Sequence, residues 1–303
     1  MNNGDTDKLK KLIFFLTLSI AILVILLAIA LSDNEARPAI GERRVAISAD
    51  AEIHYFSRGA DAGRPVILLP SYARSASDFN ELVQVLNREG FRTISIQPRG
   101  VDGSTLPSLD ITYHTNAADV AAVLDEEKIS ASVSIIGHAY GNRIARTFAT
   151  DYPSRSHQLI LLAAGGEAPT PPEVSSAIFK ALFGIFPESV RREAVAYAFF
   201  AKGNLVPKHW LQGWYPMAGL SQGNATAAAS TERTNPRWGD GGDDQLFILQ
   251  PAEDAAAAHG AASLLERFPD RVEIHFVEKA GHAILPEQRD KVGTLVLQAL
   301  KQG

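Results

Sequence analysis

Short apolar runs alternate with amphipathic stretches along residues 44–301 of this 303-residue chain. The run PVILLP at 65–70 is apolar throughout, which is typical of a parallel strand buried on both faces. The next stretch, SDFNELVQVLNREG at 77–90, has apolar residues at helical spacing and ends at Gly90. RVAIS and EIHYFSR before these segments predict a leading hairpin, and the alternation continues through RTISIQP, AADVAAVLDEE, VSIIGH, GNRIARTFATDYP, QLILLAA, QLFILQP and VEIHFVE. The pattern predicts an α/β fold with a mostly parallel central sheet flanked by helices.

An insertion at roughly 167–243 interrupts this alternation, between LLAAGG and DDQLFILQ. Its segments EVSSAIFKALFGIF and VRREAVAYAFFA have helical periodicity, so we expect a helical cap. Aromatic residues are concentrated there, and they can either form a core of the cap's own or line an apolar substrate pocket. On the second interpretation, Trp210 and Trp214 are candidate substrate-binding residues.

The run LIFFLTLSIAILVILLAIALS at 12–32 is uncharged and long enough to cross the roughly 30 Å hydrocarbon layer of a bilayer as a helix. Lysines precede it and acidic residues follow it: Lys8, Lys10 and Lys11, then Asp33 and Glu35. The positive-inside rule therefore predicts a cytoplasmic segment at 1–11 and a transmembrane signal-anchor at 12–32. A linker at 33–43 would lead to a domain at 44–303 on the extracytoplasmic (periplasmic) side of the inner (plasma) membrane, in a single-pass protein. The alternatives are a cleaved signal peptide, whose apolar region is usually about 7–15 residues, and a buried core helix.

Composition narrows the classes of function. With 46% hydrophobic and 21% charged residues, the chain can bury one large core, so we expect one domain plus appendages. A net charge of -5 with no basic stripe gives no support to a nucleic-acid partner. The chain has no Cys, its eight His form no H-E-x-x-H pattern, and it has no G-x-G-x-x-G turn. We therefore expect neither a metal nor a cofactor.

The strand VSIIGH leads into the turn Gly137-His138-Ala139-Tyr140-Gly141 and then into a helical pattern. Strand, tight glycine-bounded turn and helix is the setting of the nucleophile in G-x-S-x-G, but here Ala139 occupies the position of the serine. Two further residues complete the pattern: Asp254 follows the strand LFILQ, and His282 lies in KAGHAILPEQ before the last helix. In these elements the chain resembles the α/β-hydrolase superfamily, of the AB hydrolase-1 type, over roughly residues 44–301.

The resemblance implies a site in which the nucleophile position, the acid and the histidine follow in the order Ala139, Asp254 and His282. Asp254 would hold the imidazole of His282 in one tautomer and stabilise its protonated form, with Glu253 as a competitor for the acid role. By the same resemblance, the backbone N–H groups of Tyr140 and Tyr72 would form an oxyanion hole. Many relatives have His-Gly in the loop before Tyr72, whereas this chain has Pro70-Ser71.

Three more residues near these motifs are candidates with less specific roles. Arg74 could clamp a substrate carboxylate through a bidentate contact or could be a solvated loop residue. Arg99 is expected to brace its loop by pairing with Asp102. His138 precedes Ala139 in the turn at 137–141, which we call the elbow, and is expected to have a packing role.

Ala139 leaves three hypotheses. The first is a membrane-anchored hydrolase-family enzyme that acts on a small apolar ester-like or carbonyl substrate through the His282–Asp254 dyad, as a general base without a serine nucleophile. The second is a catalytically inactive hydrolase-like protein that binds a small ligand or a partner. The third is a serine esterase inactivated by a Ser-to-Ala substitution at 139. A small molecule and the membrane are the expected partners in the first hypothesis, which we favour.

Overall fold

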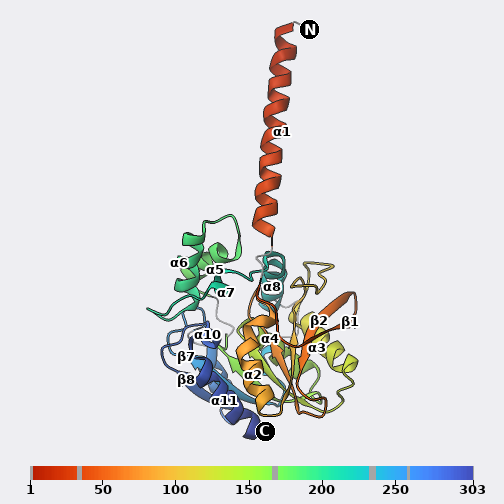
Figure 1. Cartoon of the computed structure of the whole chain (residues 1–303), viewed down its shortest axis with the longest axis vertical. Coiled ribbons are helices and arrows are strands. Elements are labelled where there is room, and N and C mark those ends of the chain that lie inside the picture. Colours follow the sequence, from red (N-terminus) through yellow and green to blue (C-terminus); the bar gives the residue numbers. More distant parts are fainter. Residues whose placement is uncertain (1–2, 33–35, 166–169, 232–236, 258–259, 303) are drawn as a thin grey trace.

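A computed structural model of the chain describes residues 3–32, 36–165, 170–231, 237–257 and 260–302. A single sheet with helices on both faces forms the body of the molecule, and a long helix, α1 (Asn3–Leu31), projects from it (Figure 1). The expected α/β architecture with a mostly parallel sheet is confirmed. Asp33, Glu35 and parts of the insertion at 167–169 and 232–236 lie outside the described residues.

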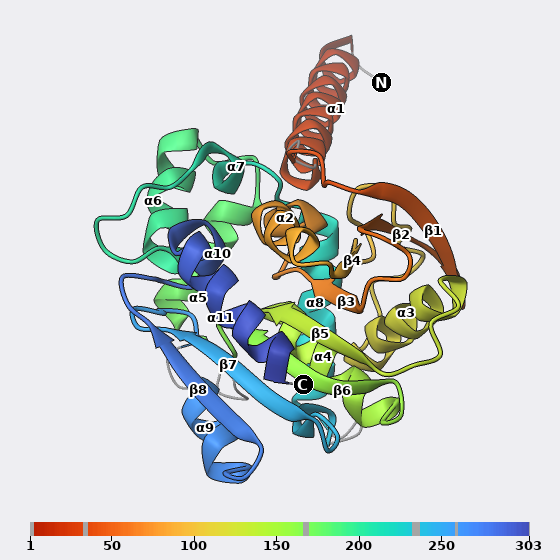
Figure 2. The same cartoon turned by 60° about the horizontal axis from the view of Figure 1, so that its bottom comes forward.

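The sheet has eight strands in the order β1-β2-β4-β3-β5-β6-β7-β8 (Figure 2). β1 and β2 form the expected hairpin, β2 also pairs antiparallel with β4, and every later pairing is parallel. The strands are β1 (Glu42–Ser48), β2 (Ala51–Arg58), β3 (Pro65–Leu69), β4 (Arg92–Ile96), β5 (Val133–His138), β6 (Ser156–Leu162), β7 (Gln245–Pro251) and β8 (Val272–Val277).

The central strands are apolar on both sides because two separate cores cover the two faces of the sheet. In β3, Ile67 and Leu69 belong to the first core, whereas Val66 and Leu68 belong to the second. The first core includes α3 (Tyr113–Glu126), α4 (Tyr140–Asp151) and α9 (Gly260–Arg267), and the second includes η1 (Ala76–Phe79), α2 (Asn80–Arg88), α10 (Ile284–Glu287) and α11 (Arg289–Gln302). Burial on both faces explains why PVILLP shows no alternation of polar and apolar residues.

The chain between β6 and β7 forms helices rather than further strands. These are α5 (Pro172–Leu182), α6 (Glu188–Phe199), α7 (Lys208–Leu211), α8 (Pro216–Ala229) and the short η2 (Trp238–Asp240). We call residues 172–229 the cap. It has an apolar cluster of its own, with Leu182, Val195 and Phe199 among its buried members. In Figure 1 the cap lies at the end of the domain from which α1 projects.

The segment between α1 and β1 contacts the domain. β1 starts at Glu42, and the chain is already packed from Ala36, whose side chain lies against Val101 and Tyr215. Arg37 forms a bidentate ion pair with Glu81, at 2.6 and 2.7 Å. From Ala36 onward, the segment expected as a linker is therefore packed on the domain, through contacts with α2 and the cap that no local sequence pattern reveals.

Helix α1 projects away from the domain, and its last turn, with Ala30 and Leu31, packs against the cap. Its segment Leu12–Leu31 has a mean hydropathy of 3.2 over 20 residues, and none of it is buried within the molecule. By length and composition this segment is able to cross a membrane, and it is the one such helix in the described part of the chain.

Candidate functional site

The turn between β5 and α4 holds Ala139 in a strained backbone conformation, with φ 50° and ψ -104°. Two glycines permit the turn. A methyl group on Gly141 would overlap the carbonyl oxygen of Leu69, and one on Gly137 would lie 2.5 Å from the carbonyl oxygen of Gly141. The Ala139 carbonyl accepts a hydrogen bond from the Asn142 side chain at 2.5 Å. Strain of this kind in a non-glycine residue is common at functional sites and persists only where the surroundings enforce it.

Gly141→Ala is expected to destabilise the fold by about 3 kcal/mol or more, because backbone cannot move aside as a flexible side chain can. The matched control is Gly223→Ala in α8, where the nearest atom to the added methyl group is the Tyr72 hydroxyl at 3.8 Å. That variant should be neutral or more stable by up to about 1 kcal/mol, since alanine favours helix. Urea unfolding of both variants checks this prediction, and equal stabilities would contradict it.

His282 and Asp254 meet at the carboxyl ends of neighbouring strands, β8 and β7. The Nδ1 atom of His282 lies 3.0 Å from both carboxylate oxygens of Asp254. Oδ1 of Asp254 also accepts the backbone N–H groups of Ala256 and Ala257, at 2.9 and 2.8 Å. Burial alone would raise the pKa of Asp254, but the imidazole and these N–H groups outweigh it and hold the pKa below its ordinary value.

This contact selects the tautomer of the neutral imidazole of His282. An ionised carboxylate only accepts hydrogen bonds, so Nδ1 carries a proton, and in the neutral ring the lone pair is on Nε2. Of the two acids that the sequence offered, Asp254 contacts His282, whereas Glu253 accepts the backbone N–H of Lys202 at 3.2 Å. The pair is therefore arranged so that Nε2 can take a proton from a bound molecule.

Beneath the elbow, His138 supports the backbone of His282. Its ring is fully buried, and Nε2 lies 2.8 Å from the carbonyl oxygen of His282, which only accepts, so Nε2 is the protonated nitrogen. Burial, assisted by the nearby His282, lowers the pKa of His138 to about 4. His138 is therefore neutral near pH 7, and its expected packing role includes this hydrogen bond.

The lowered pKa of His138 predicts an acid-sensitive fold. His138 has its ordinary pKa of 6.5 in the unfolded chain and a pKa of about 4 in the folded chain. Its contribution to the free energy of unfolding is therefore fully present above pH 6.5 and is lost as the pH falls from 6.5 to 4. The loss attributable to His138 is about 3 kcal/mol. In His138→Gln the amide can donate to the same carbonyl without titrating, so its unfolding free energy should fall less between pH 7 and pH 4. Parallel pH profiles for the two proteins would contradict the assignment.

The loop after β3 carries the other expected oxyanion donor, and the cap holds it in place. Among hydrogen bonds of the described residues, neither the Tyr72 N–H nor the Tyr140 N–H has a protein acceptor. Three neighbouring polar groups bind the cap. The Ala73 N–H donates to Gln222 at 2.7 Å, the Ala73 carbonyl accepts from the Tyr215 N–H at 3.1 Å, and the Tyr72 hydroxyl donates to the Gly219 carbonyl at 2.7 Å.

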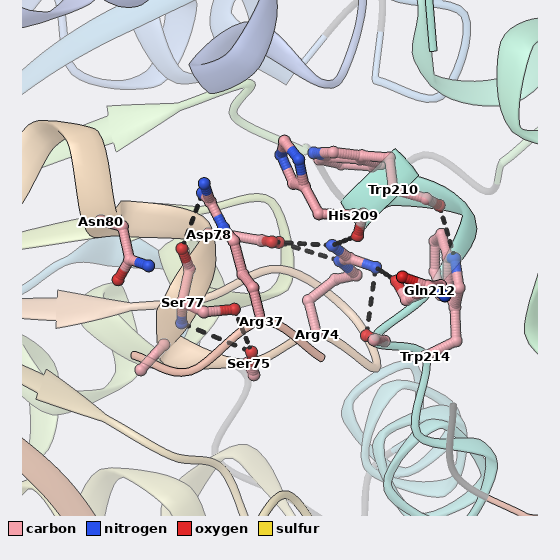
Figure 3. A network of polar contacts seen from close by, with 12 residues as sticks. Arg37, Arg74, Ser75, Ser77, Asp78, Asn80, His209, Trp210, Gln212 and Trp214 are labelled. Carbon is pink, nitrogen blue, oxygen red and sulfur yellow. Dashed lines mark hydrogen bonds and ion pairs between the residues drawn. The ribbon is translucent and has the colours of Figure 1, made fainter. Parts of the chain in front are cut away.

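Arg74 lies neither where it could clamp a substrate nor in solvent, the two expected positions. It is buried at 2% exposure, and Figure 3 shows its guanidinium between Asp78 and the cap. Two of its N–H groups bind the carboxylate of Asp78 at 2.7 and 2.9 Å, and the other three donate to the carbonyls of His209, Gln212 and Gly213. All five donors are occupied, so Arg74 is neither a substrate clamp nor a solvated residue. It ties the loop after β3, which carries the expected oxyanion donor Tyr72 and which we call the oxyanion loop, to the cap.

Trp210 and Trp214 are also corrected. Their exposures are 1% and 0%, so neither ring offers surface to a substrate. Both pack in the cap core, and the Arg74 guanidinium stacks on them at 4.6 and 4.8 Å from the ring centres. The interpretation of the aromatic residues as the cap's own core applies to these two.

Arg99 braces its loop with other partners than the expected Asp102. Its guanidinium binds both oxygens of the buried Asp119, at 2.8 and 2.9 Å, and Asp50 at 2.9 Å. Asp102 instead accepts a hydrogen bond from Gln97 at 3.1 Å. The expected pair is wrong because Asp119 comes from α3, twenty positions along the chain, which local spacing could not indicate.

Sequence reasoning missed Glu287, which holds the His282 loop. Its carboxylate accepts the N–H groups of Gly281 and Ala201, at 2.7 and 2.8 Å, and the side chain of Asn204 at 2.6 Å. Burial raises the pKa of Glu287 despite these donors. The residue joins the His282 loop to the cap, and only its position five residues after His282 could have drawn attention to it.

Two pockets lie near the site without containing the dyad. One of about 350 Å³ lies between α2, α7 and α10, with Arg37, Glu81 and His209 in its wall. Another of about 30 Å³ lies behind the elbow against Tyr140 and Gly141. No group of three or more His, Cys, Asp or Glu side chains that could hold a metal ion occurs within the described ranges.

Comparison with known proteins agrees with the observed fold. The model of the alpha/beta hydrolase fold family matches residues 64–261. A protein named as a putative non-heme chloroperoxidase in Synechocystis sp. is 25% identical over 279 residues, covering 84% of this chain and 96% of its own. Human serine hydrolase BPHL is 25% identical over 190 residues, covering 60% of this chain and 62% of its own.

Solved structures share the fold at lower identity. The esterase EaEST from Exiguobacterium antarcticum superimposes with a TM-score of 0.69 at 21% identity, covering 86% of this chain and 100% of that one. A bromoperoxidase from Bacillus anthracis superimposes with a TM-score of 0.67 at 17% identity, covering 86% of this chain and 100% of that one. At such identities the likeness concerns the fold alone.

Proposed function

The chain belongs to the α/β-hydrolase fold family, and from that premise we propose that it is a membrane-anchored enzyme whose His282–Asp254 dyad works without a serine nucleophile. Its substrate is a small apolar ester or a related carbonyl compound. The observation that carries the proposal is the buried contact of 3.0 Å between His282 Nδ1 and the ionised Asp254, which leaves Nε2 as a base.

In this proposal a water molecule takes the place of the serine oxygen beside the methyl group of Ala139. Nε2 of His282 removes a proton from the water as its oxygen bonds to the substrate carbonyl carbon. Asp254 stabilises the resulting imidazolium, and the N–H groups of Tyr72 and Tyr140 stabilise the negative oxygen. When the carbon–oxygen bond to the leaving group breaks, Nε2 returns the proton to that group, so acid and alcohol leave and the dyad is restored.

The expected rate is modest. A positioned general base contributes about 10²–10⁴-fold. An oxyanion hole with substrate binding leaves about 10³–10⁴-fold over water even when a nucleophile is absent. The enzyme should therefore turn over slowly in comparison with serine esterases.

The membrane anchor in this proposal is α1. Its support is the 20-residue apolar segment Leu12–Leu31, with the lysines on its N-terminal side and acidic residues after it. This charge difference favours an extracytoplasmic domain.

His282→Ala is expected to reduce hydrolysis of a short-chain p-nitrophenyl ester by about 10²-fold or more, to the level left by the oxyanion hole. The matched control is His275→Ala, which removes a histidine on β8 that contacts Glu273. Initial rates of the full chain in detergent micelles check this prediction. A rate that is unchanged by His282→Ala would exclude the dyad from the mechanism.

Ala139 itself favours a second candidate function, binding of a small ligand without chemistry, because a methyl group cannot attack a carbonyl. In that case the His282–Asp254 dyad has no catalytic role. A serine esterase inactivated by substitution at position 139 would likewise bind a ligand without hydrolysing it. Neither the parent chain nor the His282→Ala variant would then hydrolyse the ester, and equilibrium binding of an ester substrate analogue would be the same for both proteins.

A further inference from the structure

The domain is held at a short distance from the end of α1. Ala36 is packed against Tyr215, and a methyl group on Gly213 would lie 3.0 Å from the methyl group of Ala36. Arg37 is bound to Glu81 and to the Ser77 carbonyl, as Figure 3 shows in part. Only five residue steps separate Leu31 from Ala36, which span at most about 17 Å when fully extended. A bilayer crossed by α1 is therefore within that distance of the domain surface.

The last turn of α1 also contacts the cap directly. Ala30 and Leu31 pack against the apolar cluster of the cap. A methyl group on Gly184, in the turn between α5 and α6, would lie 3.1 Å from the carbonyl oxygen of Ile29. Figure 1 shows α5, α6 and α8 at the end of the domain nearest to α1. The cap is therefore the part of the domain that meets the membrane end of the helix.

Large apolar side chains are exposed at this place. Phe179 on α5 is 52% exposed and Ile185, next to Gly184, is 45% exposed. The Phe179 ring packs against those of Phe183 and Phe186, at 4.6 and 6.0 Å between ring centres. We call Phe179, Gly184, Ile185 and Phe186 the cap tip.

We propose that the cap tip is a bilayer-contact surface, whose occupant is the interfacial region of the phospholipid membrane that α1 crosses. Aromatic and aliphatic side chains at the level of a transmembrane helix end are the groups that membrane interfaces accommodate. The proposal rests on the anchoring role of α1 given above. It adds that the cap, which is hydrogen-bonded to the oxyanion loop, itself contacts the lipid surface.

The test adds one tryptophan per variant to the full chain as a reporter of depth in the membrane. Each variant is reconstituted into phosphatidylcholine vesicles with brominated acyl chains. The three native tryptophans are buried, at 1%, 0% and 6% exposure, and give a constant background. Phe179→Trp and Ile185→Trp report on the cap tip. Phe276→Trp is the matched control, because Phe276 is 63% exposed on β8, away from α1 in Figure 1. Phe15→Trp, 62% exposed within α1, reports on the anchor.

Brominated lipid should quench the fluorescence of the tryptophans added at 179 and 185, and their emission should be blue-shifted, as in an apolar environment. The fluorescence of the tryptophan added at 276 should be unchanged. Quenching at 15 without quenching at 179 and 185 would overturn the bilayer-contact surface while leaving the anchor intact. Absence of quenching at 15 would instead refute the anchor, and the inference with it. Equal quenching at 179 and 276 would also overturn the inference, since contact would then not be specific to the cap tip.

Discussion

Ala139→Ser is expected to raise ester hydrolysis by at least about 10³-fold. Removing the nucleophile from a serine triad costs on the order of 10⁶ in kcat, so adding it to a site whose other parts are in place should recover a large part of that factor. Those parts are present: the strained turn at Ala139, the His282–Asp254 contact and the two N–H groups of Tyr72 and Tyr140 that lack protein acceptors among the described residues.

The control for this prediction is Ala139→Ser combined with His282→Ala, in which the new hydroxyl has no base. The double variant should lose most of the gain, because serine is a weak nucleophile unless an adjacent base accepts its proton. A p-nitrophenyl ester assay of the parent, the two single variants and the double variant gives the comparison. If Ala139→Ser alone produces no gain, the oxyanion loop at Pro70-Ser71 does not have the geometry of active relatives.

Arg74→Met is expected to reduce stability by about 3–5 kcal/mol. The variant leaves the Asp78 carboxylate, whose side chain is 1% exposed, buried without its counter-charge. It also removes the donors to three carbonyls of the cap and the stacking of the guanidinium on Trp210 and Trp214. Urea unfolding of the full chain in detergent measures the loss.

Two further variants show whether the loss of stability comes from breaking the buried pair or simply from removing an arginine. Arg192→Met breaks an exposed pair with Glu188 and should cost less than about 1 kcal/mol. Arg74→Met with Asp78→Leu removes both buried charges and should regain part of the loss, because a matched apolar pair has no unpaired carboxylate. A cost for Arg74→Met no larger than that for Arg192→Met would show that the buried pair does not secure the cap.

The fold was predictable from sequence because burial determines which positions along the chain are apolar. Strands such as β3 contribute alternate residues to two cores, so they are apolar throughout, and the helices between them carry one apolar face. The elbow was predictable for a related reason, since Gly137 and Gly141 mark places where any side chain would meet backbone.

Contacts between distant segments were not predictable in this way. Arg74 looked like a loop residue because its partners in the cap come from residues about 135 positions later in the chain. Trp210 and Trp214 carried no sign of whether they face a substrate or the cap core, since both uses require large apolar rings. Glu287 and Gln222 act through backbone N–H groups, and such contacts leave no pattern in a single sequence.

We propose that hydrolysis proceeds by direct attack of water, with no covalent intermediate at position 139. The most direct test is the intact mass of the full chain, acid-quenched during turnover of a p-nitrophenyl ester, beside Ala139→Ser. The parent should form product while keeping its unmodified mass, and the Ser variant should gain one acyl group. Product formation by an acylated parent chain, or no product from the parent when the Ser variant is active, would rule out direct attack of water.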